Sequence, residues 1–395
     1  MRETQIRVDL NTIGNNAKNI VSKYKEYEYY FGVLKSSAYG HGEYIVNEIV
    51  KNGINYIAVS VLSEALKIRK YNKDIPILIL EPIDISDFET ALKYDFTLTI
   101  TDISYLKEIL AFNKNIKLHI KLDTGMNRLG FKDKEEVKEA YDLIDNSKAM
   151  LEGIYTHFAT IGLFDRYYDL QVKKLYELTS LIDLKTIPIR HVASSVIMLS
   201  HKKLDFVNGV RIGVLLYGYN TAPIIENNGL KDKLRNFRNS FYQRKYKISK
   251  LIYGAKVDVK PCMTMTTKIL QIKDVKKGEA IGYGATFVAP GDMRIAVLPI
   301  GYNNGIGNNN YGRCVIINNK KYYVIGEIAM NMMIVEIDDN VDINDEVYIL
   351  GSGISIGTLS RFDGNSIFKM LLDIGKNNKR VYTKDNKIVY EEETR

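Results

Sequence analysis

The sequence predicts an α/β fold: an N-terminal (β/α)8 barrel of the TIM type, followed by a smaller, mostly β domain. Between residues 29 and 213, short apolar runs alternate about eight times with stretches of helical period. Eight strand–helix units in roughly 200 residues match the count and length of a (β/α)8 barrel. After Pro261 the helical period disappears, and short runs rich in β-branched and aromatic residues follow one another.

Each barrel unit is expected to consist of an apolar strand and an amphipathic helix. In the first helix, Ile45 and Ile49 lie on one face and Gly53 occupies the stop position. Ser63 and Asp102 can cap the helices that follow them. The strands are expected at 29–35, 54–60, 75–80, 96–100, 115–123, 150–158, 187–193 and 205–213. The helices are expected at 43–53, 64–71, 87–94, 103–112, 134–144, 167–182 and 195–200.

A doubly wound open sheet is the alternative fold for such an alternating pattern. It would be expected to show a glycine-rich turn with G-x-G-x-x-G spacing after its first strand. The segment "SAYGHG" at 37–42 lacks that spacing. The barrel is therefore the favoured prediction.

The predicted domains are a barrel over 1–222, a polar and strongly basic insertion or linker over 223–256, and a β-rich domain over 257–395. A solvated connector explains the basic segment better than nucleic-acid binding, because nothing else in the chain supports such binding. The C-terminal strands are expected at 263–272, 280–287, 294–300, 313–319, 321–328, 332–337 and 345–351.

Composition narrows the class of protein. The net charge of +8 is spread along a chain with 26% charged residues, which is typical of a lysine-rich solvated surface rather than a nucleic-acid site. Two cysteines argue against a disulfide scaffold and for the cytoplasm. No signal peptide and no membrane span are predicted. The five histidines lack paired metal-ligand spacing, so no metal is expected.

Candidate functional residues are expected at the C-terminal ends of the barrel strands, where barrel enzymes have their catalytic groups. These residues are Lys35, Arg128, His157, Ser194, Ser195, Arg211 and Gly213. Taken singly, a lysine at a strand end is usually solvated, and a histidine after an apolar run is usually a core residue. Taken together, they predict a phosphate site after strands seven and eight, beside a nucleophilic amine. A lysine that bonds to a phosphorylated aldehyde fits that set.

Nine segments, in this order, resemble the alanine racemases, which are pyridoxal-phosphate enzymes with a barrel and a β domain. The resemblance covers nearly the whole chain. The segments are "VLKSSAYGHGEY", "KLDTGMNRLGF", "IYTHFA", "HVASS", "VRIGVLLYG", "VKKGEAIGYGATF", "LPIGYNNG", "VIGEIAMNMM" and "DEVYILG".

The resemblance implies a two-base racemase. Lys35 would hold pyridoxal 5′-phosphate covalently and act as one acid/base. Tyr283 would be the second, on the opposite face of the substrate. In the family that tyrosine comes from the partner's β domain, so a head-to-tail homodimer with shared active sites is implied. Two bases on opposite faces suit racemisation better than one mobile base.

The resemblance also assigns the residues around the two bases. Arg211 would face the pyridine nitrogen with His157 behind it, and these two cations could lower the pKa of the tyrosine base. Arg128 and the backbone of Met330 would hold the substrate carboxylate, and Tyr302 would line the entrance. The expected phosphate contacts are Tyr39, Ser195, Gly213 and Val214.

Lys121 matches a position that is carbamylated in some members of the family, where it orients the arginine. Several other positions depart from the family pattern. Ser194 stands where an asparagine is usual, and Ile212 where a proline is usual. Phe368 aligns with a phosphate-binding tyrosine and lacks its hydroxyl. These departures bear on the strength of cofactor binding and on substrate choice.

The expected function is the interconversion of L-alanine and D-alanine, supplying D-alanine for peptidoglycan. A serine or broad-specificity racemase on the same scaffold is the alternative, with Tyr302 and Asn331 as the residues that would decide. A non-catalytic cofactor-binding or regulatory protein is disfavoured by the β domain that carries Tyr283. A decarboxylase would rely on a cysteine near the site, whereas Cys314 falls in an expected strand.

Overall fold

The computed structural model describes residues 4–161, 166–221 and 257–393, and between these the positions 230, 234, 237–238, 240–241 and 244–245. The described residues form two compact units. One contains residues 13–35 and the described part of 46–260, and the other contains 4–12, 36–45 and 261–393. Most of the predicted basic segment 223–256 lies outside the described residues, so that prediction stays untested.

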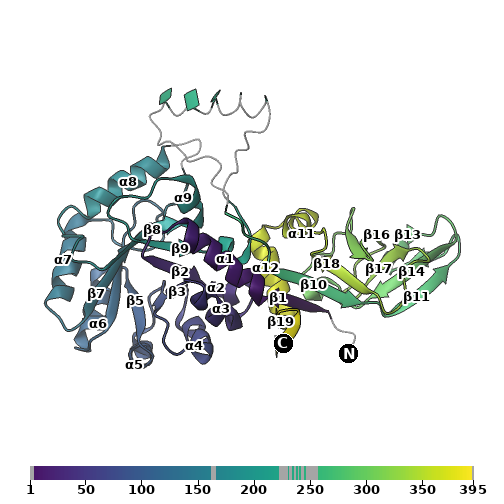
Figure 1. Ribbon diagram of the computed structural model, residues 1–395, viewed down its shortest axis with the longest axis horizontal. Coiled ribbons are helices and arrows are strands. Elements are labelled where there is room, and N and C mark those ends of the chain that lie inside the picture. The colour runs from purple at the N-terminus through teal and green to yellow at the C-terminus, as the bar shows by residue number, and fades with distance from the viewer. Residues whose placement is uncertain are drawn as a thin grey trace. The chain divides into compact units, whose positions relative to one another are not determined.

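The first unit is a closed barrel of eight parallel strands with helices around it (Figure 1). The strands follow one another in sequence order, and the last pairs with the first, Phe31 lying opposite Arg211. The barrel prediction is thereby confirmed and the doubly wound alternative is wrong. The strands are β2 (Tyr29–Val33), β3 (Tyr56–Val59), β4 (Ile77–Ile79), β5 (Phe96–Ile100), β6 (Lys117–Lys121), β7 (Met150–Tyr155), β8 (Ile189–Ser194) and β9 (Gly209–Ile212).

Helix starts in the barrel unit follow from local side-chain hydrogen bonds. Asp102 accepts from the backbone N–H of Tyr105, so the predicted cap is confirmed. The predicted cap at Ser63 is wrong, because the carboxylate of Glu64 accepts from the backbone N–H of Ser60 and the helix already starts at Leu62. The helices between residues 10 and 217 are α1 (Leu10–Lys23), α2 (Lys35–Tyr39), η1 (Glu43–Ile45), α3 (Val46–Lys51), α4 (Leu62–Tyr71), η2 (Ile85–Asp87), α5 (Phe88–Lys93), α6 (Ile103–Ala111), α7 (Lys134–Asp145), α8 (Tyr167–Leu178), α9 (Ser195–Ser200) and η3 (Val214–Tyr217). Of these, η1 and the part of α2 after Lys35 belong to the second unit.

The second unit is built on a ten-stranded sheet in the order β11-β14-β17-β16-β15-β18-β10-β1-β19-β20. Strand β1 pairs antiparallel with β10 and parallel with β19. The sequence analysis assigns β1 to the barrel domain 1–222, and these predicted domain boundaries stay a prediction. The strands are β1 (Gln5–Asp9), β10 (Met263–Lys268), β11 (Gln271–Val275), β12 (Ala280–Ile281), β13 (Phe287–Val288), β14 (Met293–Leu298), β15 (Cys314–Ile317), β16 (Lys320–Ile325), β17 (Met333–Ile337), β18 (Glu346–Leu350), β19 (Lys379–Lys384) and β20 (Lys387–Glu392).

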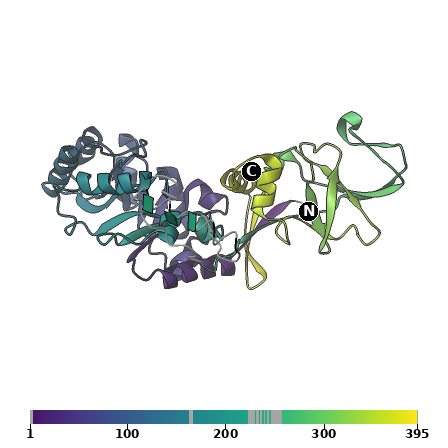
Figure 2. The same cartoon turned by 90° about the horizontal axis from the view of Figure 1, so that it is seen from above.

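Two helices of this unit were not predicted. They are α11 (Ile356–Asp363) and α12 (Ile367–Asn377), which lie side by side in Figures 1 and 2. Each starts with a serine whose side chain accepts from a backbone N–H in the first turn. The fold remains mostly β, as expected, and the serine caps were the missed signal.

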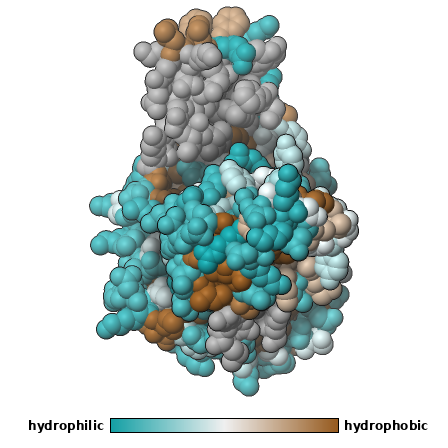
Figure 3. Space-filling model, turned by 90° about the vertical axis from the view of Figure 1, so that its right-hand side faces the viewer, coloured by the Kyte–Doolittle hydropathy of each residue, from teal (hydrophilic) through white to brown (hydrophobic). Residues whose placement is uncertain are grey.

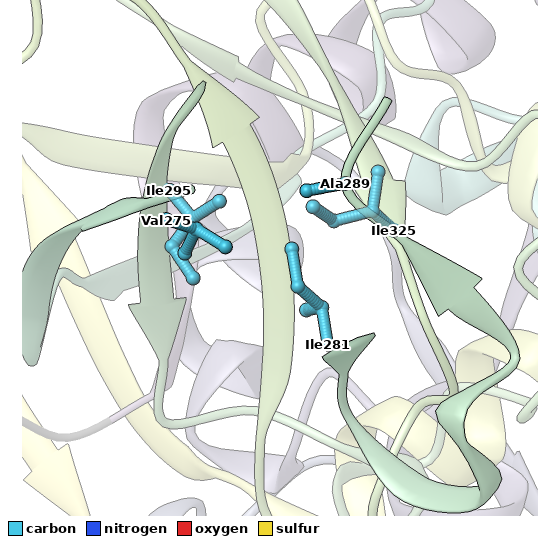
Figure 4. Close-up of a cluster of buried hydrophobic side chains, with 5 residues drawn as sticks. All are labelled: Val275, Ile281, Ala289, Ile295 and Ile325. Carbon is cyan, nitrogen blue, oxygen red and sulfur yellow. The ribbon is translucent and has the colours of Figure 1, made fainter. Parts of the chain in front are cut away.

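A small apolar cluster attaches the two-stranded ribbon β12–β13 to the sheet (Figure 4). Ile281 of the ribbon is 4% exposed, and such burial of one large aliphatic side chain contributes about 2 kcal/mol. The two strands of the ribbon flank the turn that carries Tyr283, so the cluster anchors that turn to the sheet. The cluster consists of Val275, Ile281, Ala289, Ile295 and Ile325.

Candidate active site

Lys35 lies two residues beyond β2, at the C-terminal end of a barrel strand as the sequence predicts. Its side chain is half-buried. Burial, together with the positive charge of Arg128, lowers the pKa of the Lys35 amine, while Glu64 and Glu81 act in the opposite direction. A lower pKa enlarges the neutral fraction of the amine, which is the form that attacks a carbonyl.

The backbone after Lys35 makes one left-handed turn. Residues 36–39 all have φ near +52°, a conformation that costs about 1–2 kcal/mol for each L-residue. Side chains of the same unit hold the turn: the Ser37 hydroxyl contacts the Glu43 carboxylate at 3.1 Å and accepts from Arg380 at 2.9 Å. The surrounding contacts thus impose a conformation that these residues would not adopt alone.

His41 and Gly40 close this turn. The Nδ1 atom of His41 lies 3.0 Å from the carbonyl oxygen of Ala38 and 3.1 Å from that of Tyr39, so Nδ1 carries the proton and donates. Burial lowers the pKa of His41 to about 4. These contacts give His41 a role in supporting the turn. A Cβ on Gly40 would lie 2.2 Å from the carbonyl oxygen of Leu371, which excludes any side chain there.

Tyr39 ends the turn half-buried, and its ring centroid lies 6.3 Å from that of Phe368. Burial raises the pKa of Tyr39 to about 12. Its hydroxyl therefore stays protonated at neutral pH and can donate to an anion.

Arg211 is a buried cation of the barrel with several hydrogen bonds. It is 5% exposed on β9, and its two terminal nitrogens donate to four acceptors. Nη1 donates to Nδ1 and to the backbone oxygen of His191, both at 2.8 Å, and Nη2 donates to the oxygen of Thr156 at 2.7 Å and to Nδ1 of His157 at 3.0 Å. Among the described residues it has no carboxylate partner and no acceptor for its Nε–H.

His157 lies two residues beyond β7, beside Arg211, as the resemblance implies. Because a guanidinium can only donate, Nδ1 of His157 carries no proton. Burial and the charge of Arg211, followed by that of Lys121, lower the pKa of His157 to about 3. His157 is thus neutral at physiological pH, and the expectation that it acts as a cation for the tyrosine base is wrong.

Lys121 is buried at the end of β6 in strongly positive surroundings. Burial and the neighbouring cations Arg211 and Arg128 lower its pKa to about 7. Its Nζ lies 3.5 Å from the backbone oxygen of Leu122 and 5.0 Å from the centroid of the Tyr155 ring. Arg128 itself is exposed on the following loop, where its guanidinium can meet a ligand.

Ser195 and Gly213 join the ends of β8 and β9. The backbone N–H of Gly213 donates to the Ser195 hydroxyl at 3.0 Å, and Ser195 is 6% exposed. Among the described residues, the hydroxyl proton of Ser195 has no acceptor. Val214 follows as the first residue of η3. A buried hydroxyl that can still donate suits a phosphate oxygen.

Tyr283 lies in a tight turn rather than in the predicted strand 280–287. The turn is η4 (Tyr283–Ala285), flanked by Gly282 and Gly284 with φ of 79° and 69°. These glycines interrupt the extended pattern, because positive φ is accessible to glycine at little cost. Tyr283 is 73% exposed on the single chain.

Tyr302 and Met330 are brought together by their loops in the β-rich unit. Tyr302 begins η5 (Tyr302–Asn304), and its backbone N–H donates to the oxygen of Ala329, while that of Asn303 donates to the oxygen of Met330. A Cβ on Gly301 would lie 2.0 Å from the Ala329 oxygen, so the close approach requires glycine. Tyr302 and Met330 are exposed. The face drawn in Figure 3 is mostly hydrophilic, with an apolar patch near its centre.

The barrel unit therefore gathers most of the predicted residues at one end of its strands. These are Lys35, Lys121, Arg128, His157, Ser195, Arg211, Gly213 and Val214. The sequence reasoning gave no role to His191 and Tyr155, which contact Arg211. The available signal was a histidine or tyrosine within an otherwise largely apolar strand.

The cysteines do not take part in this site. Cys314 lies in β15 as expected, and Cys262 is also buried. Burial raises the pKa of both thiols. A buried cysteine within a strand has no open access for a substrate, which disfavours the decarboxylase alternative.

Comparison with known proteins agrees with this arrangement. Residues 8–221 match the model of the alanine racemase N-terminal domain, and residues 262–382 match that of the C-terminal domain. The chain belongs to the alanine racemase family. An alanine racemase from Clostridium tetani is 32% identical over 98% of this chain and 97% of its own length. Membership makes the protein an isomerase of the racemase class.

Solved alanine racemases are similar to the protein in fold. An alanine racemase from Clostridium difficile 630 has a TM-score of 0.85 and 27% identity, covering 100% of this chain and 99% of its own. An alanine racemase from Bacillus anthracis with bound L-Ala-P has a TM-score of 0.82 and 26% identity, covering 99% and 97%. In the part of the chain that the structure describes, no helix is long and apolar enough to cross a membrane.

Proposed function

We propose that the protein interconverts L-alanine and D-alanine with pyridoxal 5′-phosphate as cofactor, and that Lys35 and Tyr283 are its two acid/bases. One observation carries the proposal. The Lys35 amine, with its lowered pKa, lies at the same end of the barrel as the buried Arg211, which keeps one N–H free. A nucleophilic amine and a fixed donor are what an aldehyde and a ring nitrogen require.

The donor set fits pyridoxal phosphate. The Lys35 amine would bond to the aldehyde carbon. The free Nε–H of Arg211 would donate to the ring nitrogen, since its other four N–H groups are already bonded. The Ser195 hydroxyl, the backbone near Gly213 and Val214, and Tyr39 would hold the phosphate. The buried, still unused proton of Ser195 supports this assignment.

The two bases divide the proton transfer. The Lys35 amine takes or returns the Cα proton on one face, and the Tyr283 hydroxyl returns or takes it on the other. Bound pyridoxal phosphate supplies an electron sink for the carbanion left at Cα. Arg211 stays protonated, so it would donate to the ring nitrogen without giving up its proton, and such a donor would restrain charge delocalisation into the ring.

Arg128, Met330 and Tyr302 are the proposed substrate-binding residues. Arg128 is exposed and positively charged, which suits a carboxylate. The backbone of Met330 would complete the carboxylate site, and Tyr302 would line the entrance. The relative that carries bound L-Ala-P supports an alanine-sized substrate.

A head-to-tail homodimer with shared active sites would complete each site. Tyr283, Tyr302 and Met330 are 73%, 45% and 54% exposed on the single chain. An acid/base needs shielding from bulk water to have a tuned pKa, and a partner subunit would provide it. The enzyme would act in the cytoplasm and supply D-alanine for peptidoglycan.

Lys121 is proposed to be carbamylated. The reaction joins a neutral amine to carbon dioxide and releases a proton, and the lowered pKa of Lys121 supplies the neutral amine. The product carries a negative charge. That charge would offset the cations Arg128 and Arg211 around it and orient the exposed Arg128.

Initial rates with L-alanine, L-serine and L-lysine test the proposed substrate. We expect alanine to be racemised fastest; equal or faster serine turnover would support the broad-specificity alternative.

A substitution at Tyr283 tests the second base. Tyr283→Phe should abolish racemisation while cofactor binding persists, and Tyr311→Phe, at an 88% exposed tyrosine, is the matched control. Unchanged racemisation by Tyr283→Phe would contradict the two-base assignment.

A further inference from the structure

A continuous chain of hydrogen bonds crosses the barrel interior from Arg211. Nη1 of Arg211 contacts Nδ1 of His191 at 2.8 Å, Nε2 of His191 contacts Nδ1 of His119 at 2.9 Å, and Nε2 of His119 contacts the Glu152 carboxylate at 3.1 Å. Both imidazoles are fully buried, and the side chain of Glu152 is 15% exposed. The four residues lie on β9, β8, β6 and β7.

The barrel leaves room for these two rings. A Cβ on Gly153 of β7 would lie 2.4 Å from the His119 ring, so only glycine permits the ring to cross there. The His191 ring is stacked between Phe31 and Tyr155, with centroid distances of 4.4 and 4.6 Å and interplanar angles of 18° and 13°. Both imidazoles are therefore held in one orientation, and only their protons can redistribute.

The two ends of the chain fix where those protons lie. Arg211 can only donate, so Nδ1 of His191 must accept and its proton must be on Nε2. That proton points at Nδ1 of His119, which must accept in turn, and the proton of His119 is then on Nε2. This last proton points at Glu152, which can only accept when ionised. Every hydrogen bond therefore runs in one direction.

Glu152 is well suited to be the accepting end. Its Oε2 accepts from the Tyr56 hydroxyl at 2.6 Å and from the Thr97 hydroxyl at 3.0 Å, besides His119. Burial alone would raise the pKa of Glu152, but the hydrogen bonds from His119, Tyr56 and Thr97 outweigh it and lower the pKa. Glu152 is the anion nearest to Arg211 along this chain, since no described carboxylate pairs with Arg211 directly.

We propose that Glu152 is a positioning residue of the racemase, which acts on Arg211 through His119 and His191. The ionised carboxylate orders both imidazole protons so that His191 always accepts from Arg211. Arg211 is then held with its Nε–H as the free donor, directed away from the four acceptors and available to the cofactor ring. This inference rests on the proposed function for the role of that donor.

An ordinary buried polar network is the competing explanation, and it predicts stability without proton order. Glu152→Gln separates the two. A glutamine amide can donate as well as accept, so it permits the opposite proton order, in which Nδ1–H of His191 would oppose the Arg211 donor. Tyr56→Phe removes a hydrogen bond from the same carboxylate but leaves its charge in place. Glu139→Gln, at an exposed carboxylate on α7, is the surface control.

The test is ¹⁵N NMR of the histidine rings in the cofactor-free protein, in which only five histidines must be assigned. The wild type and Tyr56→Phe should show His119 and His191 protonated at Nε2 alone from pH 6 to 9. Glu152→Gln should show mixed tautomers at both rings. A wild-type His191 protonated at Nδ1 would overturn the proposal, and this result does not depend on whether any variant folds. Unaltered tautomers in a folded Glu152→Gln would overturn it too.

The cofactor-loaded enzyme supplies the second readout. Glu152→Gln should lower kcat on the order of tenfold, with a smaller change in KM, and should alter the pH dependence of the cofactor absorption band. Tyr56→Phe should lose stability without that spectral change, and a Tyr56→Phe spectrum that shifts equally would contradict a role specific to Glu152. A protein with ordered tautomers that binds no pyridoxal phosphate would contradict the proposed function while supporting the proton order.

Discussion

The guanidinium of Arg211 donates to Nδ1 of His157 at 3.0 Å, and this single contact fixes the state of both groups. The histidine cannot be a cation while it accepts from a cation, and its pKa is lowered to about 3. The positive charge facing the cofactor site therefore resides on Arg211. Replacing that arginine tests how much the site depends on its planar, five-donor shape.

Arg211→Lys is expected to abolish efficient catalysis although the charge is kept. An ammonium has three donors and cannot reach four acceptors and a ring nitrogen together, so buried acceptors lose their partners. The free energy of unfolding should fall by about 2–4 kcal/mol, measured by urea titration. Arg190→Lys on β8 is the control, because Arg190 also donates to backbone oxygens. It should lose stability but keep cofactor binding, and equal loss of binding in both variants would contradict the assignment.

The buried Lys121 predicts a pH-dependent stability. Its folded-state pKa, lowered to about 7, lies below the value of about 10.4 in the unfolded chain. Between about pH 7 and about pH 10.4 the unfolded chain binds more protons than the folded protein, so the free energy of unfolding rises with pH. The cost of the buried charge is fully present below about pH 7 and disappears as the pH rises through this window. Lys121→Met should therefore stabilise the protein on the order of 2 kcal/mol more at pH 6 than at pH 9, measured without carbon dioxide. A difference of the opposite sign would contradict the assigned environment.

The proposed carbamylation of Lys121 has its own test. With ¹³C-labelled bicarbonate, a carbamate signal should appear in the wild type and be absent from Lys121→Met.

Phe368→Tyr is expected to tighten cofactor binding. The ring of Phe368 lies beside that of Tyr39, and a hydroxyl there would add a donor near the proposed phosphate site. We expect the Kd for pyridoxal phosphate to fall about three- to tenfold, measured by fluorescence quenching. Phe362→Tyr on α11 is the control. An unchanged Kd in Phe368→Tyr would show that this position does not reach the phosphate.

Gly375→Ala tests the packing that supports the left-handed turn. A Cβ on Gly375 would lie 2.3 Å from the backbone oxygen of Gly40, whereas alanine would otherwise favour a helix interior. We expect a loss of about 2–3 kcal/mol in the free energy of unfolding and weaker cofactor binding. At Gly357 a Cβ meets nothing closer than 3.7 Å, so Gly357→Ala should leave stability unchanged or slightly higher. Equal effects at both positions would contradict the steric account.

The barrel and the position of its functional residues at the C-terminal ends of the strands could be predicted because local sequence patterns specify both. A strand, a helix and the polar residue at their junction are neighbours in sequence, so Lys35 and His157 could be placed by counting units. The closure of the barrel then follows from the number of units. The pairing of β1 with β10 and β19 joins segments more than 250 residues apart, and no local pattern specifies it.

Other features depend on contacts that only the folded chain supplies. The left-handed conformation of residues 36–39 is imposed from outside by Arg380 and by the glycine contacts. The neutral state of His157 follows from burial beside cations, which a sequence pattern does not reveal. The chain that ends at Glu152 joins four strands through side chains. A polar residue within an apolar strand is visible in the sequence, but its hydrogen-bond partners on the other strands are not.

Borohydride reduction of the cofactor-loaded protein, followed by peptide mapping, tests the central claim most directly. The protein supplemented with pyridoxal phosphate should show a visible absorption band that reduction bleaches. The covalent adduct should be found on Lys35, while Lys35→Ala should show no band. Absence of the band from the wild type, or an adduct on another lysine such as Lys121, would contradict the account.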